Sequence, residues 1–407
     1  MKTLSKETGI GIPSIVLPRS DVSLHKWAVI ACDQFTSEPE YWEEVESIIC
    51  SSPSTYRIIF PEVFLGKGSK QKRIQSINAQ MKEYIDKKIL QDAVHGFVYV
   101  NRTFPSGKHR KGLMVSIDLD QYDFHEGSKT YMRATEKTVL ERIPPRVEIR
   151  ENAPLELPHV LVLIDDPEHT IIEPLEEKKG TLRKLYSTEL MLDGGSIEGY
   201  AIENETTIRS IMESLVDLKK EDGLLYAVGD GNHSLATAKQ CWENLKGTLS
   251  PELQETHPAR YALVELNNLH EPDLTFEPIH RWISNIDIDD FLSFLQGDGK
   301  EVDMIQNGVH KTIRLKDIPG ELTLGVLQQL LDEYRSNHPE MTMDYIHGEK
   351  SLEKLSQQPS SVGFLLKGID KNTLFSVIST DGCLPRKTFS MGEANEKRYY
   401  MEARKIK

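Results

Sequence analysis

The chain has 407 residues, more than one compact core usually holds, so two domains or one large domain with an appendage are expected. Its 38% hydrophobic and 28% charged residues are ordinary for a soluble globular protein and give no reason to expect disorder. The formal net charge of -14 argues against bulk binding of nucleic acid, which needs a basic face.

Strand-like and helix-like patterns alternate along the first part of the chain. Short apolar runs rich in β-branched residues predict strands, whereas an apolar period near 3.6 residues with capping residues predicts helices. The predicted strands are residues 26–32, 56–60, 159–165, 199–203, 223–228, 260–269 and 276–283, together with a hairpin over 96–119 that turns at Pro-Ser-Gly. The predicted helices are residues 33–50, capped by Thr36 or Ser37, and residues 70–90, 131–153 on both sides of a Pro144-Pro145 break, 205–218 and 233–245.

Residues 226–239, YAVGDGNHSLATAK, place a polar turn between an apolar run and a helix-like pattern. Two glycines there let the backbone take positive φ and approach a ligand closely. The free N–H groups of the first helical turn and the helix dipole are suited to an anion. Asp230 is a candidate Mg²⁺ ligand or cap, and His233 a candidate donor to phosphate. Taken alone, the stretch is also explained by a common Asp-Gly turn in which Asp230 or Asn232 only caps a helix.

Three further places hold candidate chemistry. The TEKT segment, residues 135–138, sets Glu136 among basic residues, as in a general base or metal ligand, or else on a solvated charged helix face. In EPIHRW, His280 and Arg281 either bind an anion or belong to an ordinary strand end. Asp33 ends a predicted strand, where active-site acids often lie, although Asp also commonly begins a turn.

The pattern changes near residue 285. Two helices and a pair of strands are expected beyond it, and a polar, charged tail closes the chain. These helices are residues 285–296 and 322–338, and these strands residues 361–369 and 373–380. The predicted division is therefore a catalytic or nucleotide-binding region at 1–285 and a C-terminal α+β region at 286–407.

Cysteine usage and hydropathy bear on the compartment. The four cysteines are scattered without CxxC spacing, so no zinc site is expected and reduced thiols are predicted. Residues 1–21 lack the apolar core of a signal peptide, and no apolar stretch approaches the ~20 residues that cross a bilayer. A cytoplasmic protein without membrane association is therefore expected.

The order of these motifs resembles that of domain-of-unknown-function family 1015, a large prokaryotic family. Its hallmark, a strand followed by Asp-Gly-His-His-Arg-Tyr and a helix, is matched by residues 230–235. Its upstream His-Glu-x-Thr segment is matched by residues 135–138, and an Arg on the next helix by Arg146. Its downstream Pro-Thr-His-Arg is matched by residues 278–281. The family in turn is similar to the ParB, sulfiredoxin and free serine kinase superfamily.

The resemblance implies a mixed α/β fold, in which mixed sheets flanked by helices form a ParB/sulfiredoxin-like nucleotide-binding core beside a smaller C-terminal α+β part. It also implies a phosphotransferase that uses ATP (or ADP) and Mg²⁺ to convert free L-serine to O-phosphoserine. The residues it implies are Glu136, Asp230 and His233 for catalysis, Asp230 and Glu136 for the metal, and Gly229, Gly231, Asn232, Ser234, Thr138, Arg146, His280 and Arg281 for the nucleotide.

At three positions the chain lacks a basic residue that the family pattern has. Asn232 and Thr135 stand in place of histidines, and Ser234 stands in place of an arginine. Each lost charge-assisted contact weakens phosphate binding by ~1.5–3 kcal/mol. The alternative is therefore a catalytically inactive nucleotide-binding regulatory protein of the same fold. The expected partners are the nucleotide and the small-molecule substrate; neither nucleic acid nor membrane is expected, and a homodimer is left open.

Overall fold

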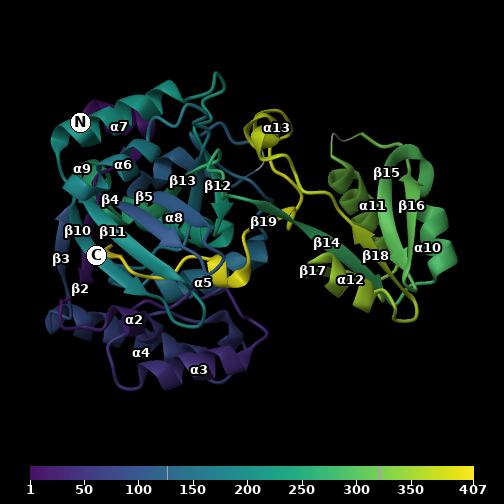
Figure 1. The fold of residues 1–407 in the computed structure, drawn as a ribbon, viewed down its shortest axis with the longest axis horizontal. Coiled ribbons are helices and arrows are strands. Elements are labelled where there is room, and N and C mark those ends of the chain that lie inside the picture. Colours follow the sequence, from purple (N-terminus) through teal and green to yellow (C-terminus); the bar gives the residue numbers. More distant parts are fainter. Residues whose placement is uncertain (126, 320–321) are drawn as a thin grey trace. The chain divides into compact units, whose positions relative to one another are not determined.

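The computed structural model describes residues 1–125, 127–319 and 322–407, which form two compact units (Figure 1). Unit 1 comprises residues 1–274 and 392–407, and unit 2 comprises residues 275–391. The chain thus leaves unit 1 once and returns to it with its final segment. These units differ from a division after residue 285, because the strand that ends at Ser284 belongs to unit 2 and the final segment to unit 1.

Unit 1 is built on a mixed sheet with the strand order β10–β11–β4–β5–β13–β9–β12–β7–β6 and with β1 beside β5. Most neighbours are antiparallel, but β13 is parallel to β9, and β7 is parallel to both β12 and β6. The strands are β1 (Ile10–Gly11), β4 (Phe97–Thr103), β5 (His109–Asp118), β6 (Tyr122–Asp123), β7 (Met132–Ala134), β9 (Leu161–Ile164), β10 (Arg183–Glu189), β11 (Ser196–Ile202), β12 (Tyr226–Asp230) and β13 (Tyr261–Asn268).

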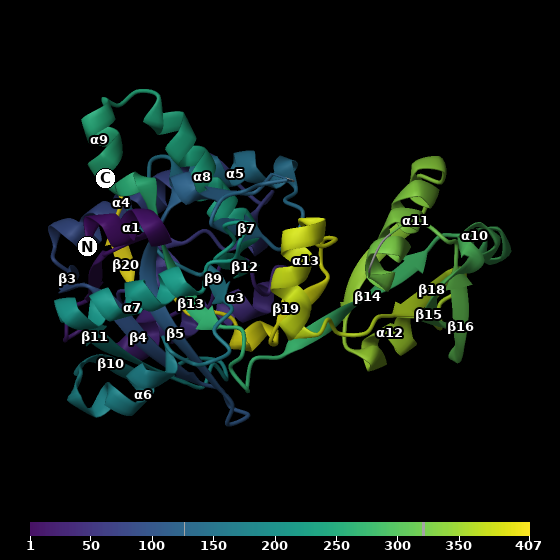
Figure 2. The ribbon, with the colours of Figure 1, turned by 90° about the horizontal axis from the view of Figure 1, so that it is seen from above.

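A second sheet of unit 1 has the order β3–β2–β20–β8 and includes the end of the chain. Its strands are β2 (Ser14–Pro18), β3 (Leu90–His95), β8 (Leu155–Glu156) and β20 (Ala403–Lys405). Figure 2 shows β20 beside the N-terminal part of the unit. The final segment is therefore an integral part of unit 1.

Helices flank these sheets, as their apolar periods predict. α4 buries Ile74, Ile77, Met81 and Tyr84 along one face, and Asn204 caps α7 by accepting a hydrogen bond from the Thr207 amide. The helices of unit 1 are α1 (Lys2–Thr8), α2 (Leu24–Trp27), α3 (Pro39–Ile49), α4 (Lys70–Asp86), α5 (Ile143–Arg150), α6 (Glu173–Lys178), α7 (Glu205–Asp217), α8 (Asn232–Lys246) and α9 (Pro251–Thr256). The mixed α/β class, with mixed sheets flanked by helices, is confirmed.

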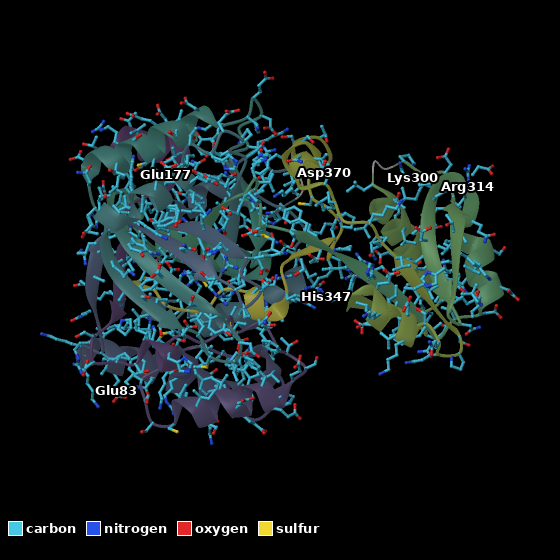
Figure 3. All side chains as sticks on the ribbon, viewed as in Figure 1. Glu83, Glu177, Lys300, Arg314, His347 and Asp370 are labelled. Carbon is cyan, nitrogen blue, oxygen red and sulfur yellow. The ribbon has the colours of Figure 1, made fainter. Side chains whose placement is uncertain are left out.

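Unit 2 is a smaller α+β body. Its antiparallel sheet has the order β16–β15–β18–β14–β17, with β19 beside β14. Apolar residues of α10 and α11 form its main core with β15 and β18. Arg314 on β16 is exposed, as Figure 3 shows. The elements are β14 (Phe276–Ser284), α10 (Ile288–Leu295), β15 (Gln296–Gln306), β16 (Val309–Leu315), α11 (Thr323–Asn337), β17 (Thr342–His347), α12 (Glu349–Leu355), β18 (Ser361–Leu365), α13 (Leu374–Asp381) and β19 (Phe389–Met391).

Four of the predicted elements are wrong. Residues 26–32 contain the end of α2 and one isolated bridge, between Ile30 and Tyr399, rather than a regular strand. Residues 56–60 begin as a 3₁₀ helix, and the second of the strands expected at 361–380 is helix α13. In 131–153, β7 and a loop precede α5, and the paired prolines lie in the first turn of that helix instead of breaking one.

None of the helices in the described parts of the chain combines the length and the apolar character that crossing a bilayer requires.

A buried network of charges lies at the centre of unit 1. Arg398 forms ion pairs with Glu265 and Glu402, and all three side chains are at most 1% exposed. Arg110 Nε also donates to Glu265 Oε1 at 3.2 Å, and the Tyr186 hydroxyl donates to Glu402. Burial by itself would raise the pKa of Glu265, but Arg110 and Arg398 outweigh it and hold that pKa at about 2. Glu265 is thus ionised at neutral pH and joins β13 to the final segment.

This network predicts a pH dependence of stability. Because the pKa of Glu265 is lower in the folded state than its ordinary value of 4.5, its contribution is complete above that value and is lost as pH falls towards about 2. We expect the free energy of unfolding to drop by about 3 kcal/mol between about pH 6 and about pH 2 from this group alone. Urea unfolding followed by tryptophan fluorescence measures it. A free energy that stays constant over this range would contradict the assignment.

Candidate functional site

The junction between β12 and α8 forms an uncapped helix start. β12 ends at Asp230, Gly231 adopts a left-handed conformation (φ 80°, ψ 25°), and α8 begins at Asn232 with no side chain capping its N-terminus. A Cβ at Gly231 would lie 3.1 Å from Val160 Cα, so both the positive φ and the close approach favour glycine. First-turn N–H groups that no side chain caps are suited to an anion.

The TEKT segment lies beside this junction. β7 and β12 pair in parallel, with Ala134 opposite Val228, and Thr135 Oγ1 donates to the Val228 carbonyl at 2.7 Å. Further along, the Val139 amide donates to His233 Nε2 at 3.3 Å. Glu136 follows Ala134 by two residues, as Asp230 follows Val228, so each acid comes shortly after the last paired residue of its strand. The structure therefore joins the two motifs at one end of the sheet.

The hydrogen bond from Val139 restricts the role of His233. A ring nitrogen that accepts a hydrogen bond carries no proton, so the proton of the neutral imidazole lies on Nδ1. The ring thereby holds Val139, the residue after the TEKT segment, against α8. A phosphate contact from His233 would have to come from Nδ1.

Asp230 is paired with a lysine from the final segment. Lys397 Nζ lies 3.0 Å from Asp230 Oδ2, and the Gly231 amide donates to Asp230 Oδ1 at 2.9 Å. The lysine side chain is only 8% exposed. Burial works to raise the pKa of Asp230, but Lys397, followed by His159 and the Gly231 amide, outweighs it and keeps the pKa below its usual value. Asp230 is therefore an anion with a buried counterion.

Asp33 lies close to the same group of residues. His159 Nε2 is 3.9 Å from Asp33 Oδ2, while His159 Nδ1 and the Tyr400 hydroxyl are 2.8 Å apart. The Cys32 amide donates to that hydroxyl at 3.1 Å. Burial raises the pKa of the Cys32 thiol to about 12, so the thiol stays protonated and is not a nucleophile. His159 thus lies near Asp33 and is also one of the groups that lower the pKa of Asp230.

Arg146 is on α5, which packs against α8 (Figure 2). Its guanidinium forms an ion pair with Glu62, and Nη1 donates to the Arg142 carbonyl at 2.8 Å. The Glu62 amide donates in turn to the Cys32 carbonyl at 2.8 Å. Arg146 therefore lies in the neighbourhood of the site but is engaged by a carboxylate, which a phosphate would have to replace.

His280 and Arg281 belong to β14 of unit 2 and have partners within that unit. His280 Nδ1 accepts a hydrogen bond from the Leu366 amide at 3.1 Å, and burial lowers its pKa. Arg281 is fully buried and donates to Gln328 Oε1 and to the Ile279 and Arg386 carbonyls. These contacts account for both side chains within unit 2, and their nucleotide role stays a prediction.

Two polar atoms at the joined motifs are buried without a hydrogen-bond partner. They are Thr138 Oγ1 and Asn232 Oδ1. Buried polar atoms are usually satisfied by protein, water or ligand, so both atoms are unusual in having no partner. Both belong to residues predicted to hold the nucleotide.

A magnesium site is not formed by the protein alone. Within the described ranges, no group of three or more His, Cys, Asp or Glu side chains is placed to hold a metal ion. Both carboxylate oxygens of Asp230 already have donors, so a cation would have to displace Lys397 or the Gly231 amide. The assignment of Asp230 and Glu136 as metal ligands stays a prediction.

Two residues at this site escaped the sequence reasoning, namely Lys397 and His159. Lys397 lies in a tail that is polar in composition, and only the adjoining apolar run at 399–401 hints that this tail is buried. His159 precedes a buried strand, a position with no motif of its own. Neither position carries a local pattern from which a pairing with Asp230 could be inferred.

Comparisons with known proteins give one family and several distant structures. A family model described as "Protein of unknown function (DUF1015)" matches residues 15–381. No curated protein matches the chain. The chain is similar to a mutant of free serine kinase in complex with ADP (12% identity, TM-score 0.42, covering 72% of this chain and 92% of that one). It is also similar to C-terminally truncated SbnI from Staphylococcus aureus (11%, 0.38, 69% and 82%) and to a conserved hypothetical protein from Pyrococcus furiosus (12%, 0.38, 71% and 94%).

Proposed function

The chain belongs to the DUF1015 family, and from this premise we propose that it is an ATP-dependent phosphotransferase acting on the hydroxyl group of a small molecule. The observation that carries the proposal is the joined site: an uncapped start of α8 behind Gly231, with the TEKT loop held beside it. We propose free L-serine as the acceptor, because the family resembles the free serine kinase superfamily, which shares its phosphate-binding turn.

The proposed reaction needs positioning and charge neutralisation more than covalent help. The serine hydroxyl oxygen forms a bond to the γ-phosphorus of ATP, while the bond from that phosphorus to the β–γ bridging oxygen breaks. The hydroxyl proton passes to the carboxylate of Glu136, which is the proposed base. The products are ADP and O-phosphoserine.

Each part of the site has a proposed role in this reaction. The amides at the start of α8 hold phosphate oxygens. Asp230 positions the Lys397 ammonium and the Gly231 amide through its contacts with both groups. Mg²⁺ would enter with the nucleotide and neutralise phosphate charge. We place the protein among cytoplasmic enzymes of small-molecule metabolism, consistent with its composition.

A nucleotide-binding regulatory protein without turnover is the second candidate. It is favoured by the composition of residues 229–234, GDGNHS, which contain no Lys or Arg to stabilise a transferring phosphoryl group. In this case a nucleotide would stabilise the protein without being consumed. The two candidates differ in turnover, which one assay separates.

The test is an assay of ADP release from ATP and Mg²⁺ with a panel of hydroxyl amino acids. We expect release with serine, and a loss of at least about 100-fold in the rate for Asp230→Asn. Asp92→Asn, a change at an exposed acid of β3, is the matched control and should keep the wild-type rate. Thermal stabilisation by ATP without ADP release from any acceptor would instead support the regulatory candidate. Neither release nor stabilisation would contradict both.

A further inference from the structure

The joined motifs contain little positive charge of their own. Residues 229–234 have no Lys or Arg, and in residues 135–138 the one lysine, Lys137, is exposed. A nucleotide phosphate brings at least one negative charge for each phosphorus, and helix N-terminal amides offset only part of it. A basic side chain from elsewhere in unit 1 would add to the charge that these amides and a bound Mg²⁺ neutralise.

The final segment supplies such a cation. Lys397 Nζ lies 3.0 Å from Asp230 Oδ2, and Asp230 precedes the first residue of α8 by two positions. The backbone around Lys397 is fixed, because the Ala31 amide donates to the Arg398 carbonyl and the Tyr400 amide donates to the Val29 carbonyl, each at 2.8 Å. The ammonium is therefore delivered by an ordered strand-like segment rather than by a mobile tail.

A buried lysine is costly unless it is paired, and Asp230 provides a carboxylate partner for Lys397. An ammonium has three donors, so it can bridge a carboxylate and a phosphate oxygen at the same time. At the same junction, Asn232 Oδ1 and Thr138 Oγ1 are buried without hydrogen-bond partners in the described structure. The family match ends at residue 381, so it leaves Lys397 unassigned.

We infer that Lys397 is a phosphate-binding residue of this site, held by Asp230 so that its ammonium contacts the terminal phosphate of a bound nucleoside diphosphate or triphosphate. The inference deepens the proposed function and rests on it for the nucleotide. It makes the final segment, which returns to unit 1 after unit 2, a functional part of the site.

The experiment measures the affinities of ADP, AMP, adenosine and pyrophosphate for the wild-type protein, Lys397→Met and Lys397→Gln. We expect Lys397→Met to weaken ADP and pyrophosphate about 10- to 100-fold while adenosine changes less than about twofold. Lys397→Gln keeps a hydrogen-bond donor for Asp230 but lacks the charge, so it controls for a folding defect. The losses of affinity for the four ligands should rank as they do in Lys397→Met. Lys405→Met, which removes an exposed partner of Asp92 on the same segment, should bind all four ligands as the wild type does.

Four outcomes distinguish a failure of the inference from a failure of the proposed function. Equal loss of all four ligands in the Lys397 variants would show a purely structural role, and unchanged ADP and pyrophosphate affinities would exclude the contact; either overturns the inference alone. Wild-type binding of pyrophosphate but of no nucleotide, with a loss in Lys397→Met, would support the lysine contact and overturn the proposed function. A wild-type protein that binds none of the four overturns both.

Discussion

Replacing Glu265 with glutamine is expected to destabilise the protein by about 3–5 kcal/mol. The carboxylate is fully buried and forms ion pairs with Arg110 and Arg398. Glutamine keeps the size of the side chain but leaves two buried guanidinium groups facing a neutral amide. The desolvation cost of those cations would then be unbalanced, and the loss is large compared with the 5–15 kcal/mol that stabilise a typical domain. Urea unfolding followed by tryptophan fluorescence measures it.

Glu83→Gln is the matched control for this prediction. Glu83 is exposed on α4, as Figure 3 shows, and forms an i,i+4 pair with Lys87. Such surface pairs contribute about 0.3–0.5 kcal/mol, so the control should unfold almost as the wild type does. If Glu265→Gln cost no more than Glu83→Gln, the buried network would not stabilise unit 1 in the way described here.

Replacing Gly231 with alanine is expected to weaken ADP binding by at least about 10-fold. Gly231 has φ of 80°, and its new Cβ would lie 3.1 Å from both the Cα and the Cγ2 of Val160. Because Val160 Cα belongs to the backbone, the turn itself must shift, and with it the first amides of α8. Isothermal titration with ADP measures the effect.

Gly223→Ala separates backbone strain from loss of the site. Gly223 also has a positive φ, of 86°, but its Cβ would meet the Lys129 carbonyl oxygen at an ordinary 3.6 Å. Both variants therefore suffer a similar left-handed penalty of about 1–2 kcal/mol in stability. Only Gly231→Ala should lose affinity for ADP. Equal affinities in the two variants would place the phosphate elsewhere.

Local patterns predicted the elements that carry their own signals. The amphipathic period of α4 and the Asn204 cap of α7 are contained within a few residues, and both elements form where expected. The strand–GDGNH–helix unit is similarly local, since a positive-φ glycine between an apolar run and a helical stripe leaves few alternatives. This part of the candidate site was therefore readable from the sequence.

Elements whose structure depends on contacts with distant parts of the chain could not be predicted from the sequence. Residues 373–380 are rich in β-branched residues and predict a strand, yet they form most of α13, because propensities of under about 1 kcal/mol yield to packing. Residues 131–134 look like part of a charged helix, but Met132 and Ala134 are buried by parallel pairing with β12, far along the chain. Because β7 occupies residues 132–134, the helix begins only at Ile143, and the two prolines lie in its first turn.

The same limit applies to the site. The TEKT segment and Asp230 reach one end of the sheet through the parallel pairing of β7 and β12, a pairing that the sequence did not predict. Lys397 reaches Asp230 only because the chain returns to unit 1 after unit 2, and no local pattern encodes that return. Residues 229–234 contain no Lys or Arg, and the cation that pairs with Asp230 is Lys397, near the C-terminal end of the chain.

We propose that a nucleotide phosphate binds at the start of α8 beside Lys397. A crystal structure of the protein with ADP and Mg²⁺ tests it most directly. We expect the terminal phosphate within hydrogen-bonding distance of the Asn232 and Ser234 amides and of Lys397 Nζ. A phosphate bound elsewhere on the protein, without contact to Lys397, would show that this site does not hold the nucleotide.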